Sequence, residues 1–329
     1  MSLYSNFARG NLMFNRYNPS ALILLVIFST VFCGCSRHWV ISKGIQYVAP
    51  VIIENGLNSF LRESDLIVAE SGITSNLKLM EVLLESNPKN KLLLNNIAFG
   101  YSAYALSFVE YEMEKAGFEE NEELEDYHRE RARNLYLRAR KYGFRSLSLT
   151  TSGKKFVQLI TNKKIDMDAI NNQLQYITAD QHEALFWTTI SWGSYLQLSR
   201  DSISELAMVP VFRLMNKRIQ ELDCQFFFGM PVMIDAMLYA MPPMIGGDEI
   251  TSNKKFNLVS DINNGRCLLS PLFKARFYCT QFDYPEAGIS ILKDIVNKNT
   301  SNWPGKYTLM NEIAKRKAKL YLKYADDIF

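Results

Sequence analysis

The chain has 329 residues, 48% of them hydrophobic, and its 37 basic and 34 acidic residues give a formal net charge of +3. This length allows one large or two ordinary domains with a substantial core. Nucleic acid is not favoured as a partner, because nucleic-acid-binding domains carry a marked basic excess. After the N-terminal region, no stretch approaches about 18 uninterrupted apolar residues, which excludes a membrane-embedded channel or permease.

The first 34 residues have the pattern of a signal peptide. Residues 1–20 carry Arg9 and Arg16 without any acidic residue, and the short apolar run 21–32 follows. This run is shorter than the roughly 20 residues that a transmembrane helix needs. The following Phe32-Cys33-Gly34-Cys35 resembles a bacterial lipobox, with phenylalanine in place of the usual leucine. We therefore expect a lipoprotein signal peptide over 1–34 and acylation of Cys35; secretion without a lipid and an N-terminal core helix are the alternatives.

A lipid on Cys35 would hold residues 35–329 on a membrane surface without spanning it. The expected location is the cell envelope, facing the periplasm, and Ser36 beside the anchor favours the outer over the inner membrane. The remaining cysteines, Cys224, Cys267 and Cys279, lie in apolar surroundings and are expected to be free thiols. No histidine or cysteine spacing indicates a metal site, and no cofactor is expected.

Helical periodicity fills the mature chain. Leu77, Met80 and Leu84, and then a second set with the same spacing, predict a helical hairpin that is broken at Asn87-Pro88. The next helix starts with an acidic cluster and ends with basic residues, which suits its dipole. Further helices are expected near 165–175, 180–198, 202–221, 226–240, 250–263, 268–282, 285–298 and 304–326.

Small residues recur at the spacing of tetratricopeptide repeats. Ala275 and Ala287 lie twelve positions apart, and so do Ala240 and Ser252. Such residues allow the two helices of a repeat to cross closely. The predicted fold class is therefore all-α, a tetratricopeptide-like helical-hairpin solenoid over 35–329.

Five blocks of sequence carry a resemblance to a known family. They are "NKLLLNNIAFGYSAYALSFVE" (90–110), "RERARNLYLRARKYGFRSL" (129–147), "FWTTISWGSYLQLSRD" (186–201), "MPPMIGGDE" (241–249) and "LMNEIAKRKAKLYLKYADDIF" (309–329). In their order and spacing they resemble the T component of tripartite ATP-independent periplasmic (TRAP) transporters. Ser252 and Asn253 depart from the alanine that usually follows the Gly-Gly of this family.

The resemblance implies an accessory lipoprotein and not an enzyme. Its implied partner is the periplasmic substrate-binding protein of a TRAP transporter, and its implied assembly is a homotrimer. It also implies that a small organic-acid ligand, which can be hydrophobic, is held in or passed through each protomer. The residues themselves also do not indicate an enzyme, because no nucleophile triad, paired-carboxylate site or phosphate-binding loop stands out.

Two groups of residues are candidates for a ligand site. Aromatic and methionine side chains suit an irregular apolar ligand, and the set to test is Trp187, Trp192, Met230 and Met241, with Tyr101 on the earlier hairpin. The basic block "LYLRARKYGFR" adds Tyr136, Arg138 and Arg140, because arginine binds carboxylates through paired hydrogen bonds. Each group has an ordinary alternative: the first can be core, and the second a solvated basic face.

Three functions remain open from the sequence. The first is the ligand-handling TRAP component, and the second is a lipid-anchored scaffold that binds only proteins. The third, a lipid-anchored enzyme that uses the acidic cluster 119–126, is disfavoured because those residues have the pattern of a solvated face.

We predict that Cys35→Ser releases the mature domain from membranes in detergent partition, because the acyl chains provide the only anchor. Cys33→Ser is the matched control and should stay membrane-bound. If Cys33→Ser is released and Cys35→Ser is retained, the processing site is misplaced.

Overall fold

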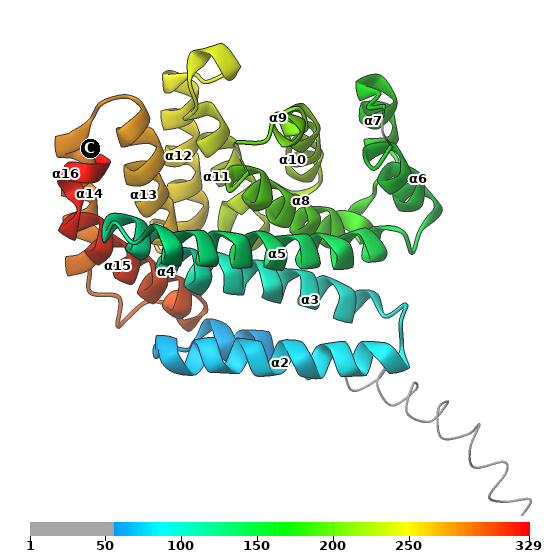
Figure 1. Ribbon diagram of the computed structural model, residues 1–329, viewed down its shortest axis with the longest axis horizontal. Helices are drawn as coiled ribbons and strands as arrows, with labels where there is room; N and C mark the ends of the chain where they lie inside the picture. The colour runs from blue at the N-terminus through cyan, green and yellow to red at the C-terminus, as the bar shows by residue number, and fades with distance from the viewer. Residues whose placement is uncertain (1–55, 163, 200) are drawn as a thin grey trace, which may run out of the picture.

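The computed structural model describes residues 56–162, 164–199 and 201–329, and all regular elements in these ranges are helices (Figure 1). The predicted all-α class is confirmed. The predicted signal peptide and Cys35 lie outside the described residues. One hydrophobic cluster extends from Ala69 to Ile328, so the described chain shares a single core.

Residues 56–61 are helical and precede the labelled elements. The first half of the chain contains α2 (Leu66–Ser86), α3 (Lys91–Tyr104), η1 (Ala105–Val109), α4 (Glu110–Phe118), α5 (Glu122–Leu147), α6 (Thr151–Ile160), α7 (Met167–Leu174), η2 (Ala179–Gln181) and α8 (His182–Gln197). The second half contains α9 (Ile203–Leu206), α10 (Val209–Asp223), α11 (Phe226–Tyr239), η3 (Pro243–Ile245), α12 (Glu249–Asn263), α13 (Leu269–Phe273), η4 (Lys274–Cys279), α14 (Pro285–Asn297), η5 (Gly305–Tyr307), α15 (Thr308–Lys323) and α16 (Ala325–Ile328).

The predicted hairpin break is confirmed between α2 and α3. Asn87 ends α2, and the side chain of Asn90 caps α3 by accepting a hydrogen bond from the Leu93 amide at 3.0 Å. Proline after Asn87 keeps that residue out of the helical region, and the asparagine cap satisfies an amide that the helix leaves free. The turn between α2 and α3 is therefore determined by its own residues, the proline and the capping asparagine.

Helix α5 is the central element, and it packs between α3 and α8 (Figure 1). Its first turn carries Glu122, Glu123 and Glu125, and its last turn carries Arg145, as the helix dipole favours. Its buried face is formed by Ala132, Tyr136, Ala139 and Gly143. These mostly small residues let the neighbouring helices approach closely.

The continuous helix Lys91–Phe118 is long and apolar enough to cross a membrane. However, 78% of its apolar window is buried inside the protein. Its apolar side chains thus contact other helices of the same chain, as those of a core helix do.

Two π-helical turns interrupt otherwise regular helices. Turn η1 joins α3 to α4, and η4 follows α13. Such turns insert a residue into the helix and occur frequently at functional sites. Neither turn follows from the hydrophobic period, which predicts a helix without distinguishing its type.

Helix α11 differs from the predicted regular helix over 226–240. Phe227, Phe228 and Gly229 have φ values of 44°, 65° and 83°, in the left-handed region. This conformation costs about 1–3 kcal/mol at each non-glycine residue, so the surrounding packing must hold it. Its consequence is that successive rings diverge, since Phe227 contacts Trp187 and Phe228 contacts Tyr307.

Helix α6 is absent from the sequence prediction. Its start, "TSGKK", has turn-like composition, yet the hydroxyl of Thr150 accepts a hydrogen bond from the Gly153 amide and caps the helix. Gly153 also packs against the end of α5, where a β-carbon would lie 2.0 Å from the carbonyl oxygen of Leu147. Close packing, and not a turn, requires this glycine.

The small-residue spacing is only partly reflected in the packing. Ser252 is fully buried and donates a hydrogen bond to the carbonyl of Ala236 at 2.9 Å, where α12 crosses α11. Ala287, in contrast, is exposed, and the neighbouring Gly288 makes the close contact, with Phe329. The proposed role of Ala287 is therefore wrong, and the tetratricopeptide register stays a prediction.

We predict that Gly143→Ala destabilises the fold by about 1–3 kcal/mol, the usual cost of overpacking. A β-carbon there would lie 2.2 Å from Thr188 Oγ1 and 3.2 Å from Thr188 Cα, so α5 and α8 would separate. Gly72→Ala in α2 is the control, because open space surrounds that position. It should stabilise the protein by about 0.5–1 kcal/mol through helix propensity. Urea unfolding measures both, and equal effects would contradict the account.

Candidate functional site

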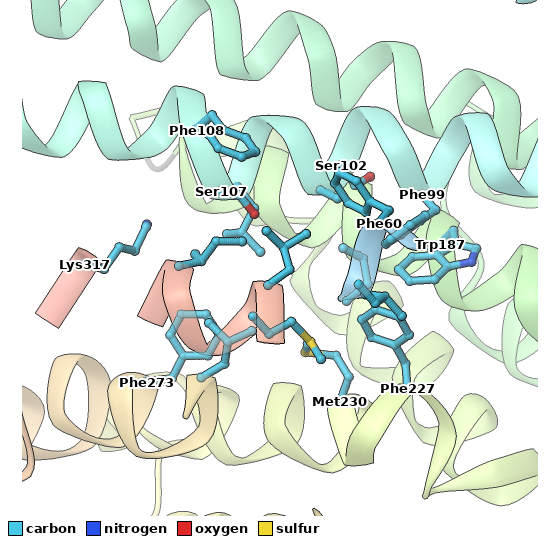
Figure 2. A pocket seen from close by; sticks show the side chains of 18 residues that line it. Phe60, Phe99, Ser102, Ser107, Phe108, Trp187, Phe227, Met230, Phe273 and Lys317 are labelled. Carbon is cyan, nitrogen blue, oxygen red and sulfur yellow. The ribbon is translucent and has the colours of Figure 1, made fainter. Parts of the chain in front are cut away.

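A partly enclosed apolar cavity of about 90 Å³ lies between the helices (Figure 2). A single water needs only about 10–15 Å³, so the cavity has room for a small organic group. It is lined by Phe60 and Leu61; Phe99, Ser102 and Ala103 of α3; Leu106, Ser107 and Phe108 of η1; Trp187 and Ile190 of α8; Phe227 and Met230 of α11; Leu269 and Phe273 of α13; and Leu309, Met310, Ile313 and Lys317 of α15.

Local backbone features place several of these side chains. The left-handed turn in α11 brings Phe227 within 5.1 Å of Trp187 and 5.7 Å of Phe99, measured between ring centroids. The π turn η1 places three consecutive residues, 106–108, in the cavity lining. Arg316 donates a hydrogen bond to the carbonyl of Ser107 in this turn. The left-handed turn of α11 and the π turn η1 therefore both contribute to the same cavity.

Among the described residues, Lys317 is the only charged side chain in the lining, and it is 3% exposed. Its ammonium group pairs with Glu114 of α4 at 3.1 Å, and Tyr321 donates to the same carboxylate at 2.9 Å. In Figure 2, Lys317 lies at one end of the cavity, and Trp187 and Phe227 lie at the other. The cavity thus has a cationic end and an aromatic end.

Of the residues predicted for the site, Trp187 and Met230 line the cavity. Tyr101 and Arg138 do not, because both bind Glu81 of α2, at 2.8 Å and 2.5 Å. Burial opposes the charged form of Glu81, but hydrogen bonds led by that of Tyr101 outweigh it and lower its pKa to about 2. Tyr101 and Arg138 therefore lie in an ion cluster that joins α2, α3 and α5.

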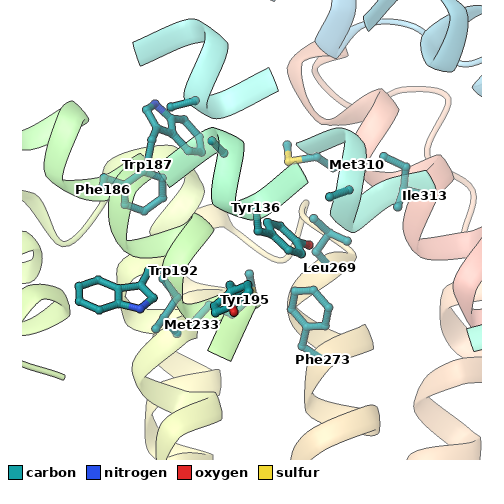
Figure 3. Packing of buried hydrophobic residues seen from close by; sticks show 14 of the residues in the cluster. Tyr136, Phe186, Trp187, Trp192, Tyr195, Met233, Leu269, Phe273, Met310 and Ile313 are labelled. Atoms are coloured by element: carbon teal, nitrogen blue, oxygen red, sulfur yellow. The ribbon is translucent and has the colours of Figure 1, made fainter. Parts of the chain in front are cut away.

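Arg140 and Trp192 lie together in another place. The guanidinium of Arg140 lies 5.2 Å from the ring of Trp192 and 5.4 Å from that of Tyr195. Figure 3 shows Trp192 beside Tyr195 and Met233, away from Trp187. Arg140 also lines an open surface hollow on α5, together with Leu137, Lys141, Phe144, Arg145 and Ser148.

Met241 and Tyr136 are separate again. Met241 is half-buried after the end of α11 and does not line the cavity. Tyr136 is fully buried and donates a hydrogen bond to Glu110 of α4. Burial raises the pKa of Glu110 to about 7, with Lys317 opposing the shift and Glu114 adding to it. Tyr136 therefore belongs to the polar network behind the cationic end.

Sequence reasoning did not identify Lys317 or Ser107. The sequence does contain a signal for Lys317. This lysine lies at helical spacing from the apolar residues Met310, Ile313 and Ala314, on a buried face where a lysine is unusual. It lies in a segment with many lysines, so composition alone hides it. Within the described ranges, no group of three His, Cys, Asp or Glu side chains could hold a metal.

The fold and the cavity define an all-helical protein with an internal chamber suited in polarity to a small apolar molecule. A sequence model of the family described as TAtT, TRAP transporter T-component, matches residues 62–329, and the chain belongs to this family. A search of curated proteins returned no match. Family membership makes the protein an accessory component associated with a TRAP transporter and with the cell envelope.

We predict that Glu110 makes stability depend on pH. Its pKa is about 7 in the fold and 4.5 in the unfolded chain, so the folded state holds the proton more tightly. Stability from this group is complete below pH 4.5 and declines as pH rises through 7, by about 3 kcal/mol in total. Glu110→Gln should remove this decline, whereas Glu119→Gln at an exposed position should keep it. Urea unfolding from pH 5 to 8 tests this; parallel curves for wild type and Glu110→Gln would contradict it.

Proposed function

We propose that this protein is the lipid-anchored, periplasm-facing T component that docks with the substrate-binding protein of its TRAP transporter and holds a small organic-acid ligand with apolar character. The apolar cavity carries this proposal. Its walls combine adaptable methionine with aromatic rings, and its one ammonium group lies at one end. An apolar occupant would contact these walls and remove its own apolar surface from water.

The docking part rests on the surface hollow of α5. Among the described residues Arg140 makes no salt bridge; burial lowers the pKa of its guanidinium, and the charge of Glu205 opposes this shift. Lys141 and Arg145 add two more cations around Phe144. An acidic side chain of a partner protein would pair with this site through charge-assisted hydrogen bonds. The hollow is separate from the cavity, so docking and ligand holding can be tested separately.

The anchor and the assembly complete the proposal. Acylated Cys35 would hold the domain on the membrane, with the outer membrane favoured, and the assembly would be a homotrimer of tetratricopeptide-like protomers. These features rest on the lipobox pattern and on the family. A scaffold that binds only proteins is the competing function, and in that case the cavity would remain empty.

We predict that Ala103→Phe removes the bound small molecule and leaves the complex with the binding protein intact, because Ala103 lines the cavity and a new ring would fill it. Ala287→Phe on the exposed face of α14 is the matched control and should retain the molecule. Both variants are purified from native membranes, checked by circular dichroism and extracted for mass spectrometry.

Two outcomes would contradict the ligand-holding role. One is wild-type protein that forms the complex but carries no small molecule, which leaves the scaffold function. The other is a molecule retained equally by wild type and Ala103→Phe, which places it outside the cavity.

A further inference from the structure

The buried ammonium of Lys317 is not explained by stability. Taking an ammonium and a carboxylate out of water costs more than most ion pairs return, and apolar replacements are often at least as stable. Here the pair of Lys317 and Glu114 lies beside an otherwise apolar chamber, where a methionine at position 317 would pack without this cost. A charged group at this place therefore points to a ligand with a complementary charge.

Lys317 has hydrogen-bonding capacity left over. An ammonium group has three donors, and both polar contacts of Lys317 go to the single carboxylate of Glu114, at 3.1 Å and 3.2 Å. Tyr321 also donates a hydrogen bond to Glu114, so a second contact holds the carboxylate of the pair in place. A second acceptor can approach the ammonium from within the cavity.

Ser107 supplies a second donor in the cavity lining. Its backbone carbonyl is occupied by Arg316, which fixes the π turn, while its hydroxyl has no hydrogen-bond partner among the described residues. Figure 2 shows the Ser107 hydroxyl between Lys317 and the aromatic end. The Lys317 ammonium and the Ser107 hydroxyl are thus two donors in an otherwise largely apolar lining, and each can bind an oxygen of a carboxylate.

We propose that Lys317 and the Ser107 hydroxyl form the head-group site for a monocarboxylic acid whose apolar tail extends toward Phe99, Trp187 and Phe227. This inference rests on the proposed ligand-holding function and specifies its ligand class. A dicarboxylic acid does not fit, because its second carboxylate would be buried among aromatic rings without a partner.

The charges around Lys317 predict how binding depends on pH. Glu110 is faced by Lys317 and Tyr321 of α15, by Glu114 of its own helix and by Tyr136 of α5, and Arg276 lies 5.9 Å from the Tyr321 ring. Above pH 7 Glu110 is charged and lies beside the Glu114 carboxylate that pairs with Lys317, so a further carboxylate is disfavoured. Below pH 7 Glu110 is neutral, since burial raises its pKa to about 7. Carboxylate binding should therefore strengthen from pH 8 to pH 6.

The test compares hexanoate with hexan-1-ol, which share an apolar tail and differ in charge, by titration calorimetry on the delipidated mature protein. Wild type should bind hexanoate at least about tenfold more tightly than the alcohol at pH 6, the effect of one charged hydrogen bond. The double variant Lys317→Met/Glu114→Gln removes both charges and leaves neither one unpaired. It should lose this preference and keep its affinity for the alcohol. Ser107→Ala should weaken hexanoate a few-fold.

The double variant Lys315→Met/Glu312→Gln is the control, because it removes a similar pair on the same helix outside the cavity lining. It should behave as wild type. Equal binding of both probes by wild type, or a preference that survives in Lys317→Met/Glu114→Gln, would overturn the head-group site alone. Failure of wild type to bind either probe would instead contradict the proposed ligand-holding function.

Discussion

The cavity depends on the contact between α15 and the helix that runs from Lys91 to Phe118. Lys317 pairs with Glu114, more than two hundred residues earlier in the chain, and Arg316 binds the carbonyl of Ser107 in the π turn of the same helix. Together these contacts close the chamber by joining the last long helix to an early one. The Arg316 contact joins the turn η1 to α15, and the Lys317–Glu114 pair places a charge at one end of a chamber that apolar packing surrounds.

Several features here are costly for stability, and they occur in the same region. They are the cavity itself, a buried ion pair, a raised carboxyl pKa at Glu110 and left-handed backbone at Phe227 and Phe228. A protein selected only to pack its helices would fill the space with apolar side chains. These four features all lie at or near one chamber. This is expected of a binding site, because local departures from ideal packing are typical of functional sites.

The sequence predicted the helices well where local chemistry determines them. The break at Asn87-Pro88 and the polarity of α5 follow from short-range rules. Helix α6 was missed because Gly153 is required by close packing against α5, whereas in the sequence it suggests a turn. The kink in α11 was missed because two of its left-handed residues are phenylalanines, which rarely adopt that conformation. Within the predicted site, Trp187 and Met230 reach the cavity, whereas Arg138 binds Glu81, 57 residues away in the chain. Which cation faces the chamber depends on contacts between helices that are far apart in the sequence. The sequence pattern alone does not show which of these helices come into contact.

The most direct measurement is a crystal structure of the mature protein soaked with 6-bromohexanoate, with bromine located by its anomalous scattering. We expect one bromine within the cavity, in contact with the rings of Trp187 and Phe227, and a carboxylate within hydrogen-bond distance of the Lys317 ammonium and the Ser107 hydroxyl. A bromine found only outside the cavity, or a reversed ligand with its carboxylate among the aromatic rings, would contradict it.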